Sequence, residues 1–498
     1  DTAAATDTAT ATDTATATDT ATDTATATAT DTATATDTAT ATDTATDGAT
    51  DGGTVCQPVA APAAVDPDPL AAMSPPGETA TMTSGGFTND YLWDGTHYLK
   101  IGTRREWGAS VVFFGMDAAG PGMNSSNVID ANDTGREVQI ALYDPDRIMQ
   151  NCAWNASCQS TPSSCASSIT YLGWNPVQGG NQCNHGSGVE WVDLAPGVLR
   201  AQVRPLHWNP DWMEPTCTDA GCSDPGKSWL EGDVVYTQRL RFIHTHLVEL
   251  RMDVEHLSDI ERAPTLQEFP TVYAVYGAAG TTNLNRILDS QGQQIPIDVP
   301  ANDGFFYKNF ESPGAWCTLQ NATQDYGVGI YYENRQKLWQ GWQKAGIFNN
   351  VRARFSFGIP ALGNVHARAY LALGSFQTVA SVFQELDQDL PPFGTLDSPA
   401  PETVLQGSLP VWGWALDNRG VTGITLLLDG AFLASLPLDQ PRPDVCKAWP
   451  GYEGCDVVGF AGTLSLAGVS PCPHLLEAVA SDGDGNERVI GRVRVFVE

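Results

Sequence analysis

Apolar and polar residues alternate along several short segments of the chain, and this period of two predicts β-strands. Residues 248–254 read Val-Glu-Leu-Arg-Met-Asp-Val, and residues 351–357 read Val-Arg-Ala-Arg-Phe-Ser-Phe. No long segment keeps the 3.6-residue period of an amphipathic helix, so the chain is predicted to be all-β. Further strands are predicted at residues 108–115, 234–243, 269–276, 326–333, 423–428 and 488–497.

Changes in composition divide the chain into four parts. Residues 1–54 form a Thr-Ala-Asp repeat, and residues 55–78 form a neck rich in Pro and Ala. Residues 79–390 are long enough for a large β-sandwich. Residues 396–498, with about one hundred residues and frequent turn signals, are predicted to form a small β-sandwich.

The small C-terminal part carries a recognisable string of residues. The string comprises Gly413-Trp414-Ala415-Leu416-Asp417, Asp429-Gly430, Arg442-Pro443-Asp444-Val445, Gly459-Phe460, His474, and Asp482 with Gly485-Asn486. It resembles a bacterial Ig-like module that is appended to many secreted proteins. The resemblance implies an Ig-like β-sandwich and an extracellular location, and it implies no chemistry.

The N-terminal repeat also has a period of two, but it lacks the residues that build a core. Almost every even position is Thr, and the odd positions are Asp, Ala or Gly. The segment contains no aromatic residue, no Leu, Ile or Val, and no Lys or Arg. It therefore cannot bury enough apolar surface to offset the entropy of ordering its backbone. We expect either a flexible linker or an extended stalk that is ordered from outside.

Two interactions would order such a stalk. Thr-rich low-complexity tracts are typical of O-glycosylated stalks, and crowded sugars hold a chain extended. Alternatively, another copy of the chain would pair with the segment as an added strand. The segment resembles the Thr-rich repeats of glycan-coated extracellular fibrils and the stalks that follow the lipid anchor of bacterial lipoproteins. The predicted glycan attachment sites are Thr8, Thr10, Thr12, Thr14, Thr16, Thr18, Thr20, Thr22, Thr24, Thr26, Thr28, Thr30, Thr32, Thr34, Thr36, Thr38, Thr40, Thr42, Thr44 and Thr46.

Charge and cysteine content limit the partners and the location. The net charge is −32, which makes nucleic acid and anionic membranes poor partners. No run of 18 apolar residues is present, so no transmembrane segment is expected. Eleven Cys in loop-like sequence predict disulfides and an extracellular or cell-surface location in a bacterium, with a lipid anchor upstream of Asp1 as one option. Because the count is odd, one Cys is free or links two chains, and Cys56 either pairs within the chain or forms that link.

Two loop regions of the large part contain residue types that bind sugars. Residues 127–139 include Asp133 and Arg136, and Trp174-Asn175 follows downstream. An aromatic platform beside bidentate polar groups is a common composition for a sugar site. We therefore expect Trp174, Asn175 and Arg136 to contact a glycan.

The loop chemistry, strand pattern and length of residues 79–390 resemble the supersandwich domains of galactose-mutarotase type. In that family a His and an acidic residue handle protons at a sugar ring. If the chain is an enzyme, the resemblance implies a carbohydrate-active one with Asp133, Arg136, His185 and Glu190 as catalytic candidates.

Each of these residues also has a structural interpretation. Arg136 would pair with Asp133 across a turn, and His185 would be a loop histidine capped by Asn184. Trp174 and the other loop tryptophans would belong to the core. No phosphate-binding loop, dinucleotide fingerprint, GxSxG or HExxH motif is present.

No metal or other cofactor is expected from the sequence. His244 and His246 share one face of a predicted strand, but no third ligand is evident. Asp482, Asp484 and Asn486 resemble the start of a calcium loop, but the distant acidic ligand is missing and Asp-Gly repeats are common in hairpin turns.

Two functions therefore remain open. The first is a secreted structural glycoprotein, a subunit of an extracellular fibril or surface appendage, with other copies of itself and attached glycans as partners. The second is a stalk-tethered carbohydrate-active enzyme or glycan-binding protein that uses the central part of the chain.

Overall fold

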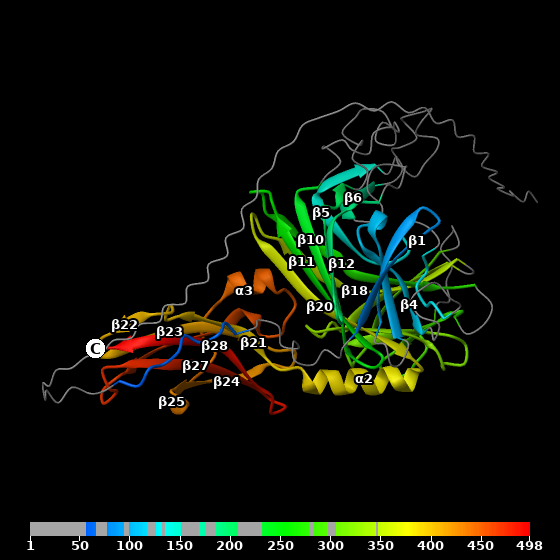
Figure 1. Ribbon diagram of the computed structural model, residues 1–498. Coiled ribbons are helices and arrows are strands. Elements are labelled where there is room, and N and C mark those ends of the chain that lie inside the picture. Colours follow the sequence, from blue (N-terminus) through cyan, green and yellow to red (C-terminus); the bar gives the residue numbers. More distant parts are fainter. Residues whose placement is uncertain are drawn as a thin grey trace, which may run out of the picture. The chain divides into compact units, whose positions relative to one another are not determined.

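The fold is all-β, as the alternation of residues predicts. The computed structural model describes residues 56–65, 77–93, 99–116, 126–131, 135–150, 169–175, 186–207, 232–277, 282–296, 305–344 and 347–498 (Figure 1). The stalk threonines from Thr8 to Thr46 lie outside these residues. Within the described residues, strands form four sheets, and helical turns are few and short.

The first sheet has twelve described strands. Its main path runs β1-β2-β3-β4-β5-β12-β18-β17-β14, while β19 pairs with β12, and β6 links β5 to β9. The bounds are β1 (Glu78–Ser84), β2 (Phe87–Trp93), β3 (Leu99–Arg104), β4 (Ser110–Met116), β5 (Val138–Gln150), β6 (Ile169–Asn175), β9 (Leu206–His207), β12 (Arg262–Val275), β14 (Phe305–Glu311), β17 (Leu338–Lys344), β18 (Phe348–Ala353) and β19 (Phe355–Ile359).

The second sheet has eight described strands in the order β13-β15-β16-β20-β11-β10-β8-β7. Neighbouring strands of this sheet all run antiparallel to one another. The bounds are β7 (Val189–Ala195), β8 (Val198–Val203), β10 (Val234–His244), β11 (Leu247–His256), β13 (Arg286–Asp289), β15 (Trp316–Gln320), β16 (Gly327–Tyr332) and β20 (Asn364–Gly374).

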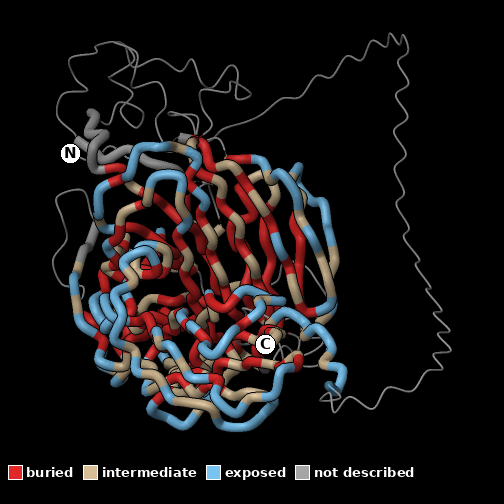
Figure 2. The backbone as a smooth tube through the Cα atoms, turned by 90° about the vertical axis from the view of Figure 1, so that its left-hand side faces the viewer, coloured by how far each residue is buried: buried red, intermediate tan, exposed pale blue. Residues whose placement is uncertain are grey.

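These two sheets share one hydrophobic core and therefore form a β-sandwich. Ile140 and Leu142 of β5 lie in the same buried cluster as Leu250 of β11 and Val328 of β16. Buried residues, red in Figure 2, follow the strands, while exposed residues gather in the turns. The alternation predicted at residues 248–254 is confirmed, since Val248, Leu250, Met252 and Val254 are all buried.

One helix corrects the expectation that no segment keeps a helical period. Helix α2 (Phe376–Asp389) begins after Ser375, whose Oγ accepts a hydrogen bond from the Thr378 N–H at 3.1 Å. Val379, Val382, Phe383 and Leu386 follow the i, i+3, i+4, i+7 spacing of an amphipathic helix and are buried. They pack on the eight-stranded sheet, where the Phe383 ring lies 5.5 Å from the ring of Trp316.

A second, smaller sandwich follows in residues 393–498. It combines a three-stranded sheet, β21-β23-β26, with a five-stranded sheet, β22-β28-β27-β24-β25, around a separate core that includes Leu409, Leu426 and Leu476. Pairing between β22 and β28 is parallel. The bounds are β21 (Phe393–Ser398), β22 (Thr403–Leu405), β23 (Ser408–Leu416), β24 (Val421–Leu428), β25 (Ala431–Leu436), α3 (Pro443–Ala448), β26 (Gly459–Ser465), β27 (Pro473–Asp482) and β28 (Glu487–Val497).

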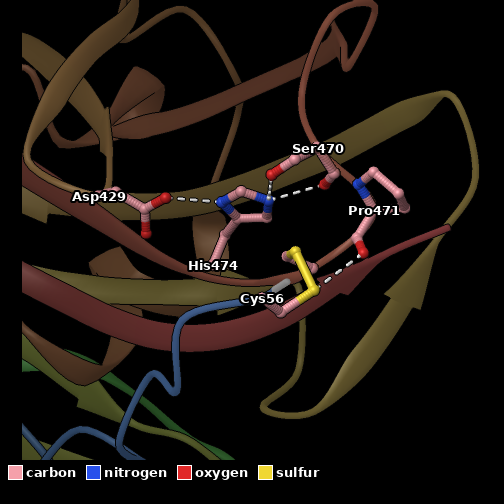
Figure 3. Close-up of a disulfide and its surroundings, with 6 residues drawn as sticks. Cys56, Asp429, Ser470, Pro471 and His474 are labelled. Atoms are coloured by element: carbon pink, nitrogen blue, oxygen red, sulfur yellow. Dashed lines mark hydrogen bonds and ion pairs between the residues drawn. A yellow bond between two sulfur atoms is a disulfide. The ribbon is translucent and has the colours of Figure 1, made fainter. Parts of the chain in front are cut away.

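Two disulfides lie in the described residues, and both involve the C-terminal sandwich. Cys56, in the neck, is bonded to Cys472 of the same chain, which is the intrachain alternative (Figure 3). Cys446 and Cys455 close a local loop beside α3, as their spacing suggests. Cys317 is buried and unpaired, so it supplies a free thiol of the kind that an odd count requires.

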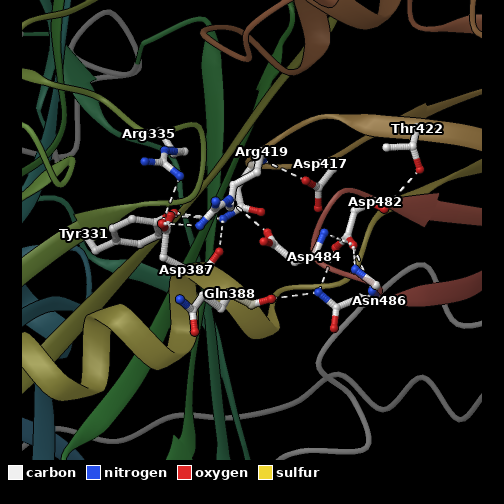
Figure 4. A network of polar contacts seen from close by, with 12 residues as sticks. Tyr331, Arg335, Asp387, Gln388, Asp417, Arg419, Thr422, Asp482, Asp484 and Asn486 are labelled. Atoms are coloured by element: carbon white, nitrogen blue, oxygen red, sulfur yellow. Dashed lines mark hydrogen bonds and ion pairs between the residues drawn. The ribbon is translucent and has the colours of Figure 1, made fainter.

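Buried polar contacts join the C-terminal sandwich to the central one. Asn418 donates to the backbone oxygen of Asp387 at 2.9 Å, and Arg419 forms an ion pair with the Asp387 carboxylate at 3.5 Å (Figure 4). Farther along the contact, the Tyr452 hydroxyl donates to the buried carboxylate of Glu333 at 2.9 Å. Side chains from both sandwiches therefore satisfy one another's polar groups.

Candidate functional site

A pocket of about 360 Å³ lies where β5, β12, β18 and β17 run next to one another in the twelve-stranded sheet. Three of these strands, β5, β12 and β18, are labelled in Figure 1. We call this site the Glu268–Arg352 pocket, after the ion pair in its wall. Its lining residues are Tyr143, Thr265, Leu266, Gln267, Glu268, Gln340, Arg352, Ala353 and Arg354.

Strand register brings the polar residues of the pocket together. Arg352 of β18 lies opposite Gln340 of β17 on one side and Thr271 of β12 on the other. The register between β12 and β5 shifts between Glu268 and Thr271, as at a β-bulge, and bulges re-aim the side chains beside them. The pocket is therefore built from strands that are distant in sequence and adjacent in the sheet.

Arg352 is the centre of the hydrogen-bond network. Its Nε and Nη2 atoms donate to Oε1 of Gln340 at 2.8 and 2.6 Å. Its Nη1 atom forms an ion pair with Oε1 of Glu268, and its guanidinium lies 5.0 Å from the ring centroid of Trp342. These contacts hold the guanidinium in one orientation, because Glu268 of β12 fixes it from one side and Gln340 and Trp342 of β17 fix it from the other.

Glu268 and Tyr143 complete the polar wall. The Tyr143 hydroxyl donates to Oε1 of Glu268 at 3.0 Å, and Nε2 of Gln267 donates to the Tyr143 backbone oxygen at 3.0 Å. Burial raises the pKa of Tyr143 to about 12, although the charge of Arg352 acts in the opposite direction. Tyr143 is therefore a protonated phenol at neutral pH and acts as a donor.

The pocket combines opposing properties that suit a polyhydroxylated ligand. Carboxylate and amide oxygens accept hydrogen bonds, while guanidinium and amide nitrogens donate them. Leu266, about two-fifths exposed, adds an apolar surface to the rim. Burial lowers the pKa of Arg352, with a raising effect from Tyr143. Among the described residues that line the pocket, Glu268 supplies the only carboxylate.

The residues predicted from loop chemistry lie mostly elsewhere or outside the described residues. Asp133 and His185 are outside them. Arg136 precedes β5 and forms an ion pair with the buried carboxylate of Asp130 at 3.5 Å. Glu190 is exposed on β7 of the eight-stranded sheet, so the structure does not bring it together with Arg136, which leads into the other sheet.

Trp174 and Asn175 lie on β6, near the pocket strands. Trp174 pairs with Leu142 of β5 and with His207 of β9, and Leu142 is the residue next to Tyr143. The predicted Trp174-Asn175 segment therefore lies on the strand next to β5, which carries Tyr143 of the pocket wall. Its role as a sugar contact stays a prediction.

Residues of the pocket wall were missed because they sit inside strands. In the sequence, Arg352 appears only as a polar residue of the alternating run at residues 351–357. The sequence did contain an indication of this site. Gln267, Glu268 and Arg352 are large hydrogen-bonding side chains inside or next to predicted strands, where a strand can form without them. Nearby, Trp339 is fully buried, as its interpretation as a core residue requires.

Neither motif with metal-ligand character forms a metal site. Strand β10 ends at His244, and His246 lies in the following turn with a φ of 74°, its Nδ1 2.8 Å from the Leu373 oxygen. The expectation that the two imidazoles share a strand face is therefore wrong. Oδ1 of Asp482 accepts the backbone N–H groups of Asp484 and Asn486, which makes the calcium-like loop a hydrogen-bonded turn.

No group of three or more His, Cys, Asp or Glu is placed to hold a metal ion in the described part of the chain. None of the described helices has the length and apolar character needed to cross a membrane.

Comparison with known proteins gives distant similarities in structure alone. No protein-family model matches the chain, and no curated protein matches its sequence. The structure is similar to a putative aldose 1-epimerase from Klebsiella pneumoniae, with 11% identity over 62% of this chain and 86% of the other and a TM-score of 0.36. A putative aldose 1-epimerase from Escherichia coli K12 gives 8% identity over 60% of this chain and 99% of the other, with a TM-score of 0.33.

A third similarity extends over more of the chain. It is to a polysaccharide lyase, with 6% identity over 84% of this chain and 47% of the other and a TM-score of 0.31. These neighbours include aldose 1-epimerase sandwiches, the type that residues 79–390 resemble. At such TM-scores the similarities carry no argument about activity, so function has to be argued from the pocket itself.

Proposed function

We propose that this chain is a secreted glycan-binding protein and that its central sandwich holds a sugar in the Glu268–Arg352 pocket. The observation that carries this proposal is the convergence of Arg352, Glu268, Gln340 and Tyr143 on one pocket wall with fixed mutual hydrogen bonds. Sugars present hydroxyl groups that both donate and accept, so they are recognised by such pre-oriented polar groups.

Size and surface chemistry also favour a sugar. A volume of about 360 Å³ lies at the lower end of the range of small-molecule pockets, which is about 300–1,000 Å³. Leu266 offers an aliphatic contact for the apolar face of a pyranose ring, and Ala353 leaves room beside it. The polar wall would form hydrogen bonds with the hydroxyl groups at the edge of the sugar ring, while Leu266 at the rim covers the apolar face of the ring.

The pocket supports binding more directly than hydrolysis. Glycosidases of the common type use two carboxyl groups on opposite sides of the scissile bond. Glu268 is the sole carboxylate among the described lining residues, and both Arg352 and Tyr143 engage it. We therefore assign the pocket to recognition, with the catalytic candidates Asp133, Arg136, His185 and Glu190 left as predictions.

Secretion is supported by the disulfides of the described residues. Cys56–Cys472 and Cys446–Cys455 are bonds of a kind that persists in oxidising compartments. The fibril-subunit hypothesis depends on residues 1–54, which lie outside the described residues, and it stays a prediction together with the O-glycosylated stalk.

The test is a glycan array followed by calorimetric titration of the best ligand with a variant that fills the pocket. Thr265→Trp adds a large side chain to a partly buried lining position without removing any member of the Arg352 network. We expect this variant to lose measurable binding because the indole occupies the space of the sugar. Thr237→Trp is the matched control, since Thr237 is a partly buried position on β10 of the other large sheet.

Two results would reject the proposal. One is an array on which no glycan binds to the intact protein. The other is equal affinity in the parent and in Thr265→Trp, which would place any sugar site outside the Glu268–Arg352 pocket. Unchanged thermal unfolding in Thr265→Trp is required for the comparison, and circular dichroism would measure it.

A further inference from the structure

Two arginines separated by a single residue line the same pocket, but they differ in their hydrogen bonds and ion pairs. Arg352 is held by Gln340 and Glu268. Arg354 follows two positions later. In an extended chain residues i and i+2 share a face, and both arginines accordingly line the pocket. The difference between these two side chains is the starting point for identifying the ligand.

The backbone of Arg354 is hydrogen-bonded, whereas its guanidinium has no hydrogen-bond or ion-pair partner among the described residues. The Arg354 N–H donates to the Leu338 oxygen at 2.8 Å, which ties this residue to the start of β17. Within the described residues, the guanidinium of Arg354 makes no hydrogen bond, ion pair or ring contact, and its Nε atom is buried without an acceptor. An unpaired buried donor destabilises a protein unless a ligand supplies the acceptor.

Arg354 also gives the pocket a net positive charge. The charged lining residues are Glu268, Arg352 and Arg354, and the first two neutralise one another. One positive charge therefore remains in a chain whose net charge is −32. At physiological ionic strength, charges are screened over about 8 Å, so a bound group responds to Arg354 more than to distant acidic residues.

We propose that the pocket takes an acidic sugar, a uronic acid, and that Arg354 binds its carboxylate. This inference rests on the proposed glycan-binding function. The guanidinium is a planar fork whose paired N–H groups match the two oxygens of a carboxylate. A single uncompensated charge suits a monoanion better than a dianion such as a phosphate ester. Arg352 and Gln340 then remain available for the ring hydroxyls.

The experiment compares charged and neutral forms of the same sugar. Trisaccharides that carry a single galacturonate, mannuronate or glucuronate residue beside neutral sugars, and the methyl ester of each, would be titrated at about 0.15 M salt. A sulfated galactose trisaccharide would be the alternative monoanion. The variants are Arg354→Gln, which removes the charge, and Arg354→Lys, which keeps the charge but loses the fork. Arg200→Gln is the control, because Arg200 is an exposed arginine of β8, 3.9 Å from Asp193.

We expect at least one uronate trisaccharide to bind the parent protein about tenfold or more tightly than its methyl ester. Arg354→Gln should abolish this preference, Arg354→Lys should restore part of it, and Arg200→Gln should leave it unchanged. The thermal unfolding temperature of Arg354→Gln should not fall below that of the parent, because the guanidinium has no hydrogen bond or ion pair within the described residues to lose. A purely structural role would instead lower stability without changing the preference.

Failure of this inference is distinguishable from failure of the proposed function. Equal binding of acid and ester, both lost in Thr265→Trp, would overturn the assignment of Arg354 and leave the glycan pocket in place. Binding of the sulfated sugar alone would overturn the assignment of a carboxylate. A parent protein that binds no glycan of any kind would reject both.

Discussion

Asp417 lies at the junction of the two sandwiches, and its ionisation should set how stability depends on pH. The residue follows β23 and is about one-twentieth exposed. Its Oδ1 accepts the Arg419 N–H at 2.7 Å, while its buried Oδ2 has no hydrogen-bond partner within the described residues (Figure 4). Burial, with added repulsion from Asp482 and Glu333, raises the pKa of Asp417 to about 7, and the Arg419 N–H lowers it only in part.

The sign of the effect follows from which state binds the proton. Between pH 3.8, the ordinary pKa of Asp, and pH 7, Asp417 is protonated in the folded chain and ionised in the unfolded chain. The folded state binds more protons in this window, so the free energy of unfolding falls as pH rises through it. The interval between these two pKa values, at about 1.4 kcal/mol per pH unit, gives a loss of about 4 kcal/mol above pH 7.

Asp417→Asn removes the ionisation and keeps the shape of the side chain. Near pH 4 the variant and the parent should have similar stability, because Asp417 is then largely neutral. At pH 8 the variant should be more stable by up to about 4 kcal/mol. Urea unfolding at constant ionic strength, in steps from pH 4.5 to pH 8, measures the difference.

The difference between parent and variant isolates Asp417 from other titrating groups. Asp233 and Asp253, for example, have lowered pKa values despite burial. Asp233 accepts a hydrogen bond from Arg262 at 2.8 Å and lies near His256, and Asp253 is hydrogen-bonded to His366 at 2.6 Å, so their stabilisation is lost at low pH. Asp439→Asn, at an exposed carboxylate, is the control and should not alter the profile. Identical pH profiles for the parent and Asp417→Asn would refute the assignment of a raised pKa.

Two further predictions concern the core contact and the stalk. Glu333→Gln should lower the free energy of unfolding by about 3–5 kcal/mol, because it removes the closer carboxylate from buried Arg368, at 2.6 Å, and leaves that guanidinium only the Glu249 carboxylate at 3.8 Å among the ion pairs of the described residues. Glu261→Gln, at an exposed pair with Lys447, should cost less than about 1 kcal/mol, and equal losses in urea unfolding would contradict the argument. Intact mass and glycopeptide mapping of native material should show sugar on most Thr of residues 1–54, and a bare mass would make this segment an unmodified linker.

The sequence located most strands because strand formation leaves a local signature. Alternation at residues 248–254 predicts β11, and the burial of Val248 and Leu250 confirms it. Helix α2 had an equally local signature, since Val379, Val382, Phe383 and Leu386 carry the helical spacing and Ser375 is a good N-cap residue. That helix was predictable in principle and was missed because the surrounding pattern is so strongly β.

The candidate site was not predictable in the same way. Clusters of Asp, His and Trp in the sequence point to loops, whereas the pocket joins Tyr143 of β5, Glu268 of β12 and Arg352 of β18. Alternation shows that Arg352 and Arg354 share a face, but it does not show which strands flank that face. Strand order and register depend on packing across the whole sandwich, so they bring together residues that no spacing in the sequence connects.

The sequence by itself determined the all-β class, the acidic character and the Thr-Ala-Asp repeat, because each depends on composition or on neighbouring residues. Only the tertiary structure decided that Cys56 pairs with Cys472, that Glu333 is shared by both sandwiches, and that the Arg354 guanidinium lines the pocket with no hydrogen-bond or ion-pair partner among the described residues. The physical reason is that burial, ion pairing and the absence of a partner are properties of three-dimensional neighbours, which chain order alone does not specify.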